Sequence, residues 1–311
     1  MLNIYKNDFS GKMNEISQFD KGSWIHLSHP SEQEKQLLVQ ELNIDLEFLS
    51  DALDEEELGR IDRDGNRVKL FVDIPICTKD GAKDIYSTVP LGILIMDNYF
   101  VTVCLEETAV IDEFTANKVR NLQTHMRTRF VLQILYLTSF YYLQFLKKIN
   151  RQIETLEMSL RRSMKNKELL TLLELQKSLV YFSTSLETNN MLIERLFSGT
   201  FLKMYEEDKE LLEEVKIEIR QATKMTETYT VILGNIMNCF GSVISNNVNH
   251  VVKLLTAITI IITLPMVIGT FYGMNVELPI QSNPHAFAII MVMSVTITSI
   301  TAILFWRKKY F

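Results

Sequence analysis

Two long apolar segments near the C-terminus dominate the hydrophobic pattern of this sequence. Residues 251–271 carry a single charge, Lys253, and residues 284–306 carry none. At about 1.5 Å of rise per residue, an α-helix made from either segment is long enough to cross a hydrocarbon core of roughly 30 Å. One such stretch is also typical of a buried helix in a soluble protein. Two in succession, joined by a short link, predict a membrane hairpin.

The charges around the hairpin predict its orientation. The link, residues 276–283, contains Glu277 and no Lys or Arg, whereas Arg307, Lys308 and Lys309 directly follow the second span. By the positive-inside rule, the C-terminal end lies in the cytoplasm. Because two spans cross the membrane twice, the long segment before them lies on the same side. We therefore expect a multi-pass protein of the plasma membrane with both termini in the cytoplasm.

Small polar side chains follow one stripe along the first span and the segment before it. They recur at spacings of three and four residues, a period of about 3.5 that keeps one helix face turned towards a common axis. Polar groups that face lipid are disfavoured, so the stripe is expected to face protein or water. With two apolar positions included, its members are Asn235, Asn238, Ser242, Ser245, Asn249, Val252, Thr256, Thr259, Thr263, Met266 and Thr270.

The stripe has two interpretations. In the first, the Thr hydroxyls bond back to their own helix and the Asn amides hold neighbouring helices together, as in a membrane-anchored helical scaffold or adaptor without conduction. In the second, several copies of the chain surround a pore, because a hairpin of two helices does not enclose a channel alone. We favour the pore, since contacts between helices need only a few polar positions and this stripe is long.

A pore with this lining suits a hydrated divalent cation. Mg²⁺ gives up its water reluctantly, so hydroxyls, amides and carbonyls that bond to its hydration shell suit it better than a cage of carboxylates. Rings of Val252, Leu255 and Met266 would close such a tube by dewetting. The expected transported ion is therefore Mg²⁺.

The segment that follows the first span carries a family resemblance. Tyr272, Gly273, Met274 and Asn275 end this span, Glu277 lies in the link, and the basic tail follows the second span. In this arrangement the chain resembles the CorA family of magnesium transporters. The resemblance implies a funnel-shaped homopentamer that takes up Mg²⁺, with Co²⁺ and Ni²⁺ as further candidate ions.

The resemblance also implies roles for single residues. Gly273, Met274 and Asn275 correspond to an outer selectivity ring, and Asn249 matches a pore-facing residue that contacts the hydrated ion. We expect Gly273 to leave the helix with a positive φ, which glycine adopts readily, and Asn275 to offer its amide oxygen to water. Cytosolic Mg²⁺ is further implied to bind the protein and hold the pore closed.

Acidic residues crowd two places outside the membrane spans. One run lies within residues 51–57, and the other lies at the start of the helix that leads into the membrane. Such runs are usually solvated faces, but between copies of a chain they would repel one another unless a divalent cation bridged them. The candidate ligands of a regulatory Mg²⁺ are Glu207, Glu210, Glu213 and Glu214.

The segment before the membrane spans begins with an expected cytoplasmic α/β domain at residues 1–110. Ser31 and Glu34 form a capping box that opens a helix to about Leu42, and residues 45–53 form a second helix. A tight turn at Asp97-Asn98 joins two strands. Alternating apolar positions predict strands at 24–27, 67–76, 85–96 and 99–105. We expect a small mixed sheet flanked by helices.

From about residue 112 onward the pattern is helical. A cytoplasmic helical region at 111–200 contains expected helices at 112–123, 127–165 and 167–197. A stalk helix at 201–271 then continues into the first span. The outer loop at 272–283, the second span at 284–306 and the basic tail at 307–311 complete the chain.

Composition and motifs argue against two functions, nucleic-acid binding and catalysis. The net charge of -6 and the pI of about 5.5 argue against nucleic-acid binding. The five His residues are scattered, and the sequence contains neither a nucleophile elbow nor a phosphate loop, so we do not expect an enzyme. The expected partners are other copies of the chain, the lipid bilayer and divalent cations.

Overall fold

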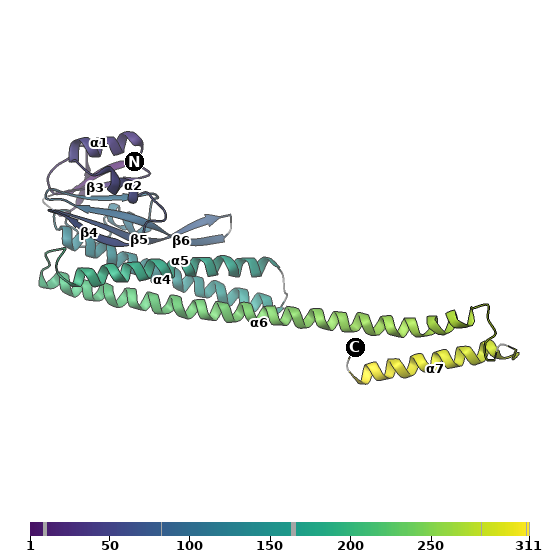
Figure 1. The fold of residues 1–311 in the computed structure, drawn as a ribbon. Helices are drawn as coiled ribbons and strands as arrows, with labels where there is room; N and C mark the ends of the chain where they lie inside the picture. The colour runs from purple at the N-terminus through teal and green to yellow at the C-terminus, as the bar shows by residue number, and fades with distance from the viewer. Residues whose placement is uncertain (9–10, 82, 163–165, 281, 309, 311) are drawn as a thin grey trace. The chain divides into compact units, whose positions relative to one another are not determined.

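The computed structural model describes residues 1–8, 11–81, 83–162, 166–280, 282–308 and 310. The chain forms two compact units, Met1–Asn235 and Ile236–Phe311. The first contains a β-sheet and long helices, and the second contains the two apolar helices (Figure 1). This order confirms the predicted succession of an α/β domain, long helices and two C-terminal apolar helices.

Among the described residues, seven strands form one mixed sheet in the order β2-β1-β3-β7-β6-β5-β4. β3 and β7 run parallel, whereas the other neighbouring pairs are antiparallel. The strands are β1 (Leu2–Asn7), β2 (Met13–Ile16), β3 (Ser23–Ser28), β4 (Arg60–Asp64), β5 (Arg67–Asp80), β6 (Lys83–Ile95) and β7 (Tyr99–Cys104).

The four predicted strands are confirmed as β3, β5, β6 and β7. The turn at Asp97-Asn98 is also confirmed, because Met96 N donates to Tyr99 O at 3.0 Å and β6 pairs antiparallel with β7. β1, β2 and β4 were not predicted. β1 buries only Ile4 and β4 buries only Ile61, so neither strand shows the alternation that marks a half-buried strand.

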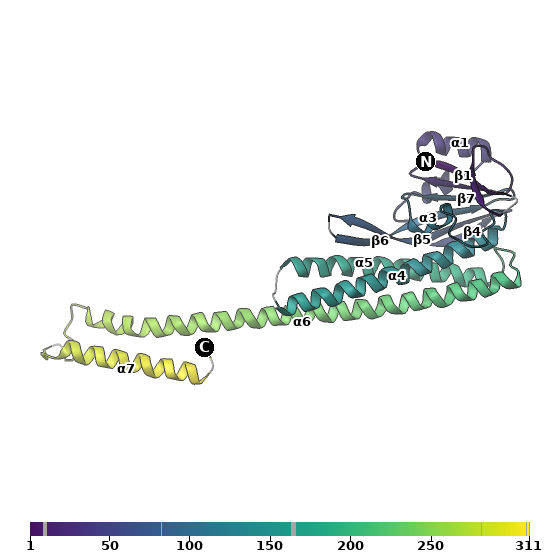
Figure 2. The ribbon, with the colours of Figure 1, turned by 180° about the vertical axis from the view of Figure 1, so that it is seen from behind.

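Helices cover both faces of the sheet (Figures 1 and 2). On one face, α1 (Glu32–Leu42) and α2 (Leu46–Asp51) bury Leu38 and Phe48 in a core shared with Ile25. On the other face lie α4 (Arg127–Arg162) and α5 (Asn166–Phe197). There the ring of Phe130 stacks on Phe100, with 4.4 Å between their centroids. The predicted sheet flanked by helices is therefore present.

The helix predicted at 112–123 has different bounds. α3 spans Ala109–Thr115 and begins earlier because Thr108 caps it, accepting a hydrogen bond from Ile111 N at 3.3 Å. It also ends earlier, because Asn117 has a φ of 56°. The Asn117 amide bonds to both the N and the O of Met13, each at 3.1 Å. This contact with β2 replaces the continuation of the helix.

The other helix predictions hold more closely. The capping box of Ser31 and Glu34 is present at α1, and α4 and α5 match the predicted long helices, although Lys165 lies outside the described residues. α6 (Glu206–Tyr272) begins at Glu206 rather than near Phe201. Tyr205 N donates to the Asp208 carboxylate at 3.0 Å, which fixes this later start.

The Ile236–Phe311 unit contains the C-terminal part of α6 and all of α7 (Ala286–Arg307). Both helices are long and apolar enough to cross a membrane. α7 runs back alongside α6 in both views (Figures 1 and 2). The membrane part of α6 has one row of side chains that are buried or half-buried, namely Leu254, Ala257, Ile261, Leu264 and Ile268. Of the predicted basic tail, Lys309 lies outside the described residues.

Candidate functional site

The polar stripe of α6 is exposed along its whole length. Every member from Asn235 to Thr270 is exposed. At 3.6 residues per turn, the membrane part of the stripe, residues 252–270, points about 160° away from the covered residues Leu254 to Ile268. Within one chain the stripe therefore faces away from α7 and is left uncovered.

Within the described residues, five of the six hydroxyls of the stripe, all except that of Ser245, donate to their own helix. Each donates to the carbonyl four residues earlier, which has no proton of its own, so each hydroxyl is left with lone pairs that accept. The pairs are Ser242 to Asn238 O at 3.0 Å, Thr256 to Val252 O at 2.8 Å, Thr259 to Leu255 O at 2.8 Å, Thr263 to Thr259 O at 2.7 Å and Thr270 to Met266 O at 2.8 Å. The stripe consequently presents acceptors rather than donors at these positions.

This bonding by itself does not separate the two interpretations of the stripe. Thr296, Thr298 and Thr301 of α7 also donate to the carbonyls four residues earlier. What distinguishes α6 is the combination of register and exposure: its hydroxyls share one face, and α7 does not cover that face.

The amides at the start of the second unit line a shallow hollow on α6. Asn238 and Asn249 are exposed, and within the described residues neither amide makes a hydrogen bond. The hollow is lined by Met237, Asn238, Gly241, Ser242, Ser245, Asn246 and Asn249. One chain thus leaves a polar surface here whose amides are available to water or to another molecule.

The apolar members of the predicted path are exposed as well. Val252, Leu255 and Met266 expose 55%, 63% and 62% of their surface. Val252 and Met266 lie on the stripe, whereas Leu255 lies about 60° to one side of its mean direction at 3.6 residues per turn. Within one chain these residues form no constriction.

The Tyr272-Gly273-Met274-Asn275 segment lies where α6 ends. Gly273 N donates to Gly269 O at 3.0 Å and Met274 N donates to Phe271 O at 3.3 Å, so the chain leaves the helix through tight turns. The positive φ predicted for Gly273 is wrong; among the described residues of this loop, Ile280 has a positive φ, at 75°. The bond from Gly273 N to Gly269 O is a helical bond, so Gly273 keeps a negative φ and the chain leaves the helix after it.

Most side chains of the segment 272–277 are exposed. Met274, Asn275 and Glu277 are exposed. Tyr272 is half-buried, and its hydroxyl donates to Pro279 O at 3.4 Å, which ties the end of α6 to the loop. Asn275 is therefore free to bond to water, as its predicted role requires.

The four candidate regulatory acids lie in the first turns of α6 but do not form a site within one chain. Glu207 already pairs with Arg129 at 3.1 Å, while Glu210, Glu213 and Glu214 are exposed and have no ion pair among the described residues. Across the described ranges, no group of three or more His, Cys, Asp or Glu residues is placed to hold a metal ion. Their proposed role between subunits stays a prediction.

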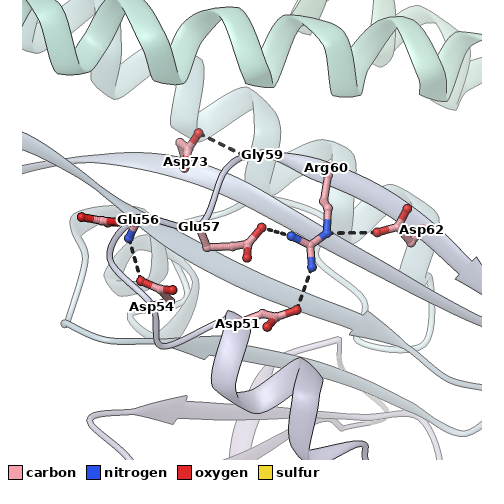
Figure 3. A network of polar contacts seen from close by, with 8 residues as sticks. All are labelled: Asp51, Asp54, Glu56, Glu57, Gly59, Arg60, Asp62 and Asp73. Atoms are coloured by element: carbon pink, nitrogen blue, oxygen red, sulfur yellow. Dashed lines mark hydrogen bonds and ion pairs between the residues drawn. The ribbon is translucent and has the colours of Figure 1, made fainter.

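The acids of residues 51–57 are organised by a cation that the sequence interpretation overlooked. Arg60 donates to Asp51 at 2.7 Å, to Asp62 at 3.1 Å and also to Glu57 (Figure 3). Its guanidinium lies 4.4 Å from the centre of the Phe71 ring. Arg60 lies three residues after Glu57 and two residues before Asp62. This close spacing of a cation and acids in the sequence could have indicated the ion pairs. Asp51 and Glu57 thus already have a positive partner.

A second overlooked acid, Asp73 of β5, lies buried between the sheet and α5. Its carboxylate accepts from Thr188 Oγ1 at 2.7 Å and from Gly59 N at 3.3 Å, and only 4% of its surface is exposed. Burial raises the pKa of Asp73 to about 6. Its backbone also bonds to the Asn189 amide at 3.0 and 2.8 Å. Asp73 therefore joins β5 to α5.

Comparisons with known proteins agree with this arrangement. A family model described as CorA-like Mg2+ transporter protein matches residues 19–309. The cobalt/magnesium transport protein CorA of Methanocaldococcus jannaschii is 28% identical over 313 residues, which cover 96% of this chain and 95% of that protein. The complete structure of the CorA magnesium transporter from the same organism matches with a TM-score of 0.84 at 25% identity, covering 100% of this chain and 99% of that one.

A more distant match shows a shared fold alone. The structure of the full-length CmaX protein has a TM-score of 0.73 at 15% identity and covers 98% of this chain and 96% of its own. The family model extends from the sheet through both apolar helices and so includes the stripe and residues 272–275. The chain therefore belongs to the family of CorA-like Mg²⁺ transporter proteins.

Proposed function

We propose that this chain is one subunit of a channel or transporter for the uptake of divalent cations, chiefly Mg²⁺, with Co²⁺ and Ni²⁺ as further candidates. The observation that carries the proposal is the exposed polar stripe of α6, which α7 leaves uncovered and which leads to residues 272–275. The family and the name of the cobalt/magnesium transport relative support a divalent cation as substrate. The named CorA relatives are transport proteins, in agreement with the expectation that the chain is not an enzyme.

The pore is formed by several copies of the chain, five by the family resemblance, each contributing its stripe. A polar face of this length is disfavoured against lipid, so other copies and water are its expected surroundings. Gly234 and Gly241 support close packing between copies. A Cβ added at either position would meet no atom within 4 Å, which leaves room for a neighbouring helix.

The lining suits an ion that keeps its water. The first-shell waters of Mg²⁺ direct their protons outward, so they bond to acceptors. The hydroxyls of Thr256, Thr259 and Thr263 have already given their protons to α6, and their lone pairs accept from such waters. Asn249 adds an amide oxygen. The lining carries no fixed charge that would strip the ion or trap it.

The selectivity ring is formed by Gly273, Met274 and Asn275 on the outer side of the membrane. Arg307 and Lys308 at the end of α7 favour the cytoplasmic side for both termini, and the loop that holds Glu277 then faces outward. An exposed amide at Asn275 bonds to hydration water, and the Glu277 carboxylate raises the local concentration of cations. Rings of Val252 and Leu255 near the inner end of the span, and of Met266 nearer its outer end, close the path by dewetting.

Cytosolic Mg²⁺ regulates the pore by binding between subunits near the start of α6. Glu210, Glu213 and Glu214 are exposed without a cation partner among the described residues, which suits a bridging ion. Glu207 contributes less, because Arg129 already compensates its charge.

Reconstitution tests the transport proposal. The purified chain is placed in liposomes that contain a Mg²⁺-sensitive dye, and Mg²⁺ is added outside. We expect a rise in the internal dye signal that protein-free liposomes do not show and that a monovalent salt does not elicit. If correctly assembled oligomers give no flux under any gradient or membrane potential, the alternative of a non-conducting helical scaffold holds instead.

A further inference from the structure

A cavity outside the ion path gathers basic side chains in the Met1–Asn235 unit. It measures about 800 Å³ and lies where the ends of β4 and β5 meet the start of α4 and the loop before α6. Its cationic lining consists of Arg63, Arg127, Arg129 and Lys203. The lining also includes Glu206, Glu207 and Asp208, so cations exceed acids here, whereas the whole chain has a net charge of -6.

The acids that also line the cavity are already paired. Glu207 and Asp208 lie 3.1 and 3.9 Å from Arg129, and Glu206 pairs with Lys209 at 3.0 Å. The side chains of Glu206 and Glu207 are 82% and 81% exposed, so water screens their charge. These carboxylates therefore do not neutralise the remaining cations of the cavity.

Three cations are left without a carboxylate partner among the described residues, namely Arg63, Arg127 and Lys203. Arg63 donates to Gly65 O at 3.1 Å and to Thr200 O at 2.9 Å, and Arg127 donates to Met96 O. Backbone carbonyls orient a guanidinium but leave its charge uncompensated. The arginines are thus held in place and still able to attract an anion.

The start of α4 adds further uncompensated positive charge to the cavity. Its first turn contains Arg127 and Arg129 and no acidic residue. The N-terminal end of a helix carries a partial positive charge, so cations there raise the free energy, and an anion in the cavity would offset this cost.

We propose that this cavity binds a phosphate-bearing anion of nucleotide size. Arginine matches the geometry of phosphate oxygens, and the volume lies within the range of small-molecule sites, about 300–1,000 Å³. Tyr205, which is 69% exposed, lines the cavity and offers a ring on which a base can stack. The shared chemistry is a chain of phosphates, supplied either by a nucleoside triphosphate or by free polyphosphate.

Isothermal titration of the full-length chain in detergent micelles tests the proposal. ATP and inorganic triphosphate are titrated separately in a buffer with a chelator and no divalent cation, so that removal of bound Mg²⁺ does not imitate binding. We expect saturable binding that weakens with added salt. Lys203→Gln and Arg63→Gln should each weaken binding about tenfold, the loss of one charge-assisted hydrogen bond. Lys224→Gln, a control on the exposed surface of α6, should bind as the wild type does.

The two probes separate the possible sources of the phosphate chain. Tighter binding of ATP than of triphosphate, lost in Tyr205→Ala, identifies a nucleotide, and equal binding of both identifies the phosphate chain alone. The proposal is overturned if neither probe saturates at low millimolar concentration, or if Lys203→Gln and Lys224→Gln bind equally. Because binding is measured without flux, this result is independent of the transport proposal.

Discussion

Single side chains of α6 differ in what they can offer to a hydrated ion. A threonine hydroxyl that donates to its own helix can only accept from a water molecule, whereas the free amide of Asn249 can both accept and donate. The stripe therefore combines acceptor positions at Thr256, Thr259 and Thr263 with a more versatile position at Asn249. This division predicts that the centre of the path discriminates against anions.

A fixed positive charge on the stripe should block conduction. In Thr263→Lys, the ammonium group would repel a divalent cation in a narrow, weakly polar path. Ile262→Val lies about 100° round the helix, at a residue that is 60% exposed, and should be mild. Dye-loaded liposomes report the initial rate of Mg²⁺ entry for both variants, with oligomer size checked by size exclusion. Equal rates in the two variants would mean that the stripe does not face a pore.

Removal of the amide at the outer end should impair uptake without harming assembly. Asn275 is exposed, so Asn275→Ala leaves no cavity in a core. If its oxygen bonds to hydration water of the ion, the loss of about 1.5–3 kcal/mol lowers uptake about tenfold or more. The rate of Mg²⁺ entry is compared with the elution volume of the oligomer. Normal uptake with a normal oligomer would remove Asn275 from the selectivity ring.

The buried carboxyl of Asp73 should make stability depend on pH. Its folded pKa of about 6 lies above the ordinary value, so the folded state binds the proton more tightly than the unfolded state. The resulting stabilisation is complete below about pH 4 and is lost as the pH rises through 6, a change of at most about 3 kcal/mol. Asp73→Asn, whose amide oxygen can still accept from Thr188, should not show this loss.

The measurement is the thermal midpoint of the full chain in micelles between pH 4 and 7.5. Asp73→Asn should gain stability relative to the wild type as the pH rises through 6. A difference between the two proteins that does not change with pH would show that Asp73 titrates alike in the folded and unfolded states. The neighbouring Tyr142, whose pKa is raised by burial, stays neutral throughout this range.

Among the secondary-structure elements, those with one regular buried face could be predicted from the sequence. The alternation in β5 and the capping box of α1 are local signals, and both gave elements in the right place. β1 and the end of α3 depend instead on tertiary contacts, such as the Asn117 amide on Met13, and no local pattern encodes them. Asp73 misleads for a related reason: a charged residue in an alternating strand suggests a position that faces solvent, but Thr188 of α5 and Gly59 N bond to its carboxylate in the interior.

The contact between α2 and β6 sets a limit on side-chain size. A Cβ at Gly92 would lie 2.4 Å from the Cβ of Ala52, closer than two side chains can approach. Gly92→Ala should therefore lower the free energy of unfolding by about 1–3 kcal/mol, because α2 must shift away from the sheet. Thermal unfolding of the full chain measures this loss. Ala52→Gly combined with Gly92→Ala removes the clash, and if this pair does not restore stability, the contact is not the cause.

For the whole molecule, the proposed pore needs several copies of the chain, each supplying one stripe. The spacing of the stripe and the residues 272–275 could be predicted from the sequence, because periodicity and short motifs are local. The geometry of the proposed selectivity ring could not be predicted, because in this proposal it arises between chains, and one chain leaves Val252, Met266 and Asn275 exposed. The same holds for Glu213 and Glu214, whose proposed partners belong to another copy.

The gating proposal makes a prediction at this scale. If Mg²⁺ bridges acids of neighbouring subunits, the closed assembly binds more Mg²⁺ than the open one, and raised cytosolic Mg²⁺ must shift the population towards closed. Glu213→Gln with Glu214→Gln removes both the repulsion and the ligands while keeping shape, and both side chains are exposed. Protection of the cytoplasmic part from protease by millimolar Mg²⁺ should then weaken, and uptake should respond less to internal Mg²⁺.

Limited proteolysis across a Mg²⁺ titration separates this mechanism from a general effect of charge. Glu32→Gln with Glu47→Gln removes the same charge from exposed positions of α1 and α2 and should leave the titration curve of the wild type unchanged. If the Glu213 and Glu214 variant also follows the wild-type curve, these acids are a solvated face. The acidic run at residues 51–57 is then a poor alternative site for the regulatory Mg²⁺. Arg60 already lies between Asp51 and Glu57, where a bridging cation would bind.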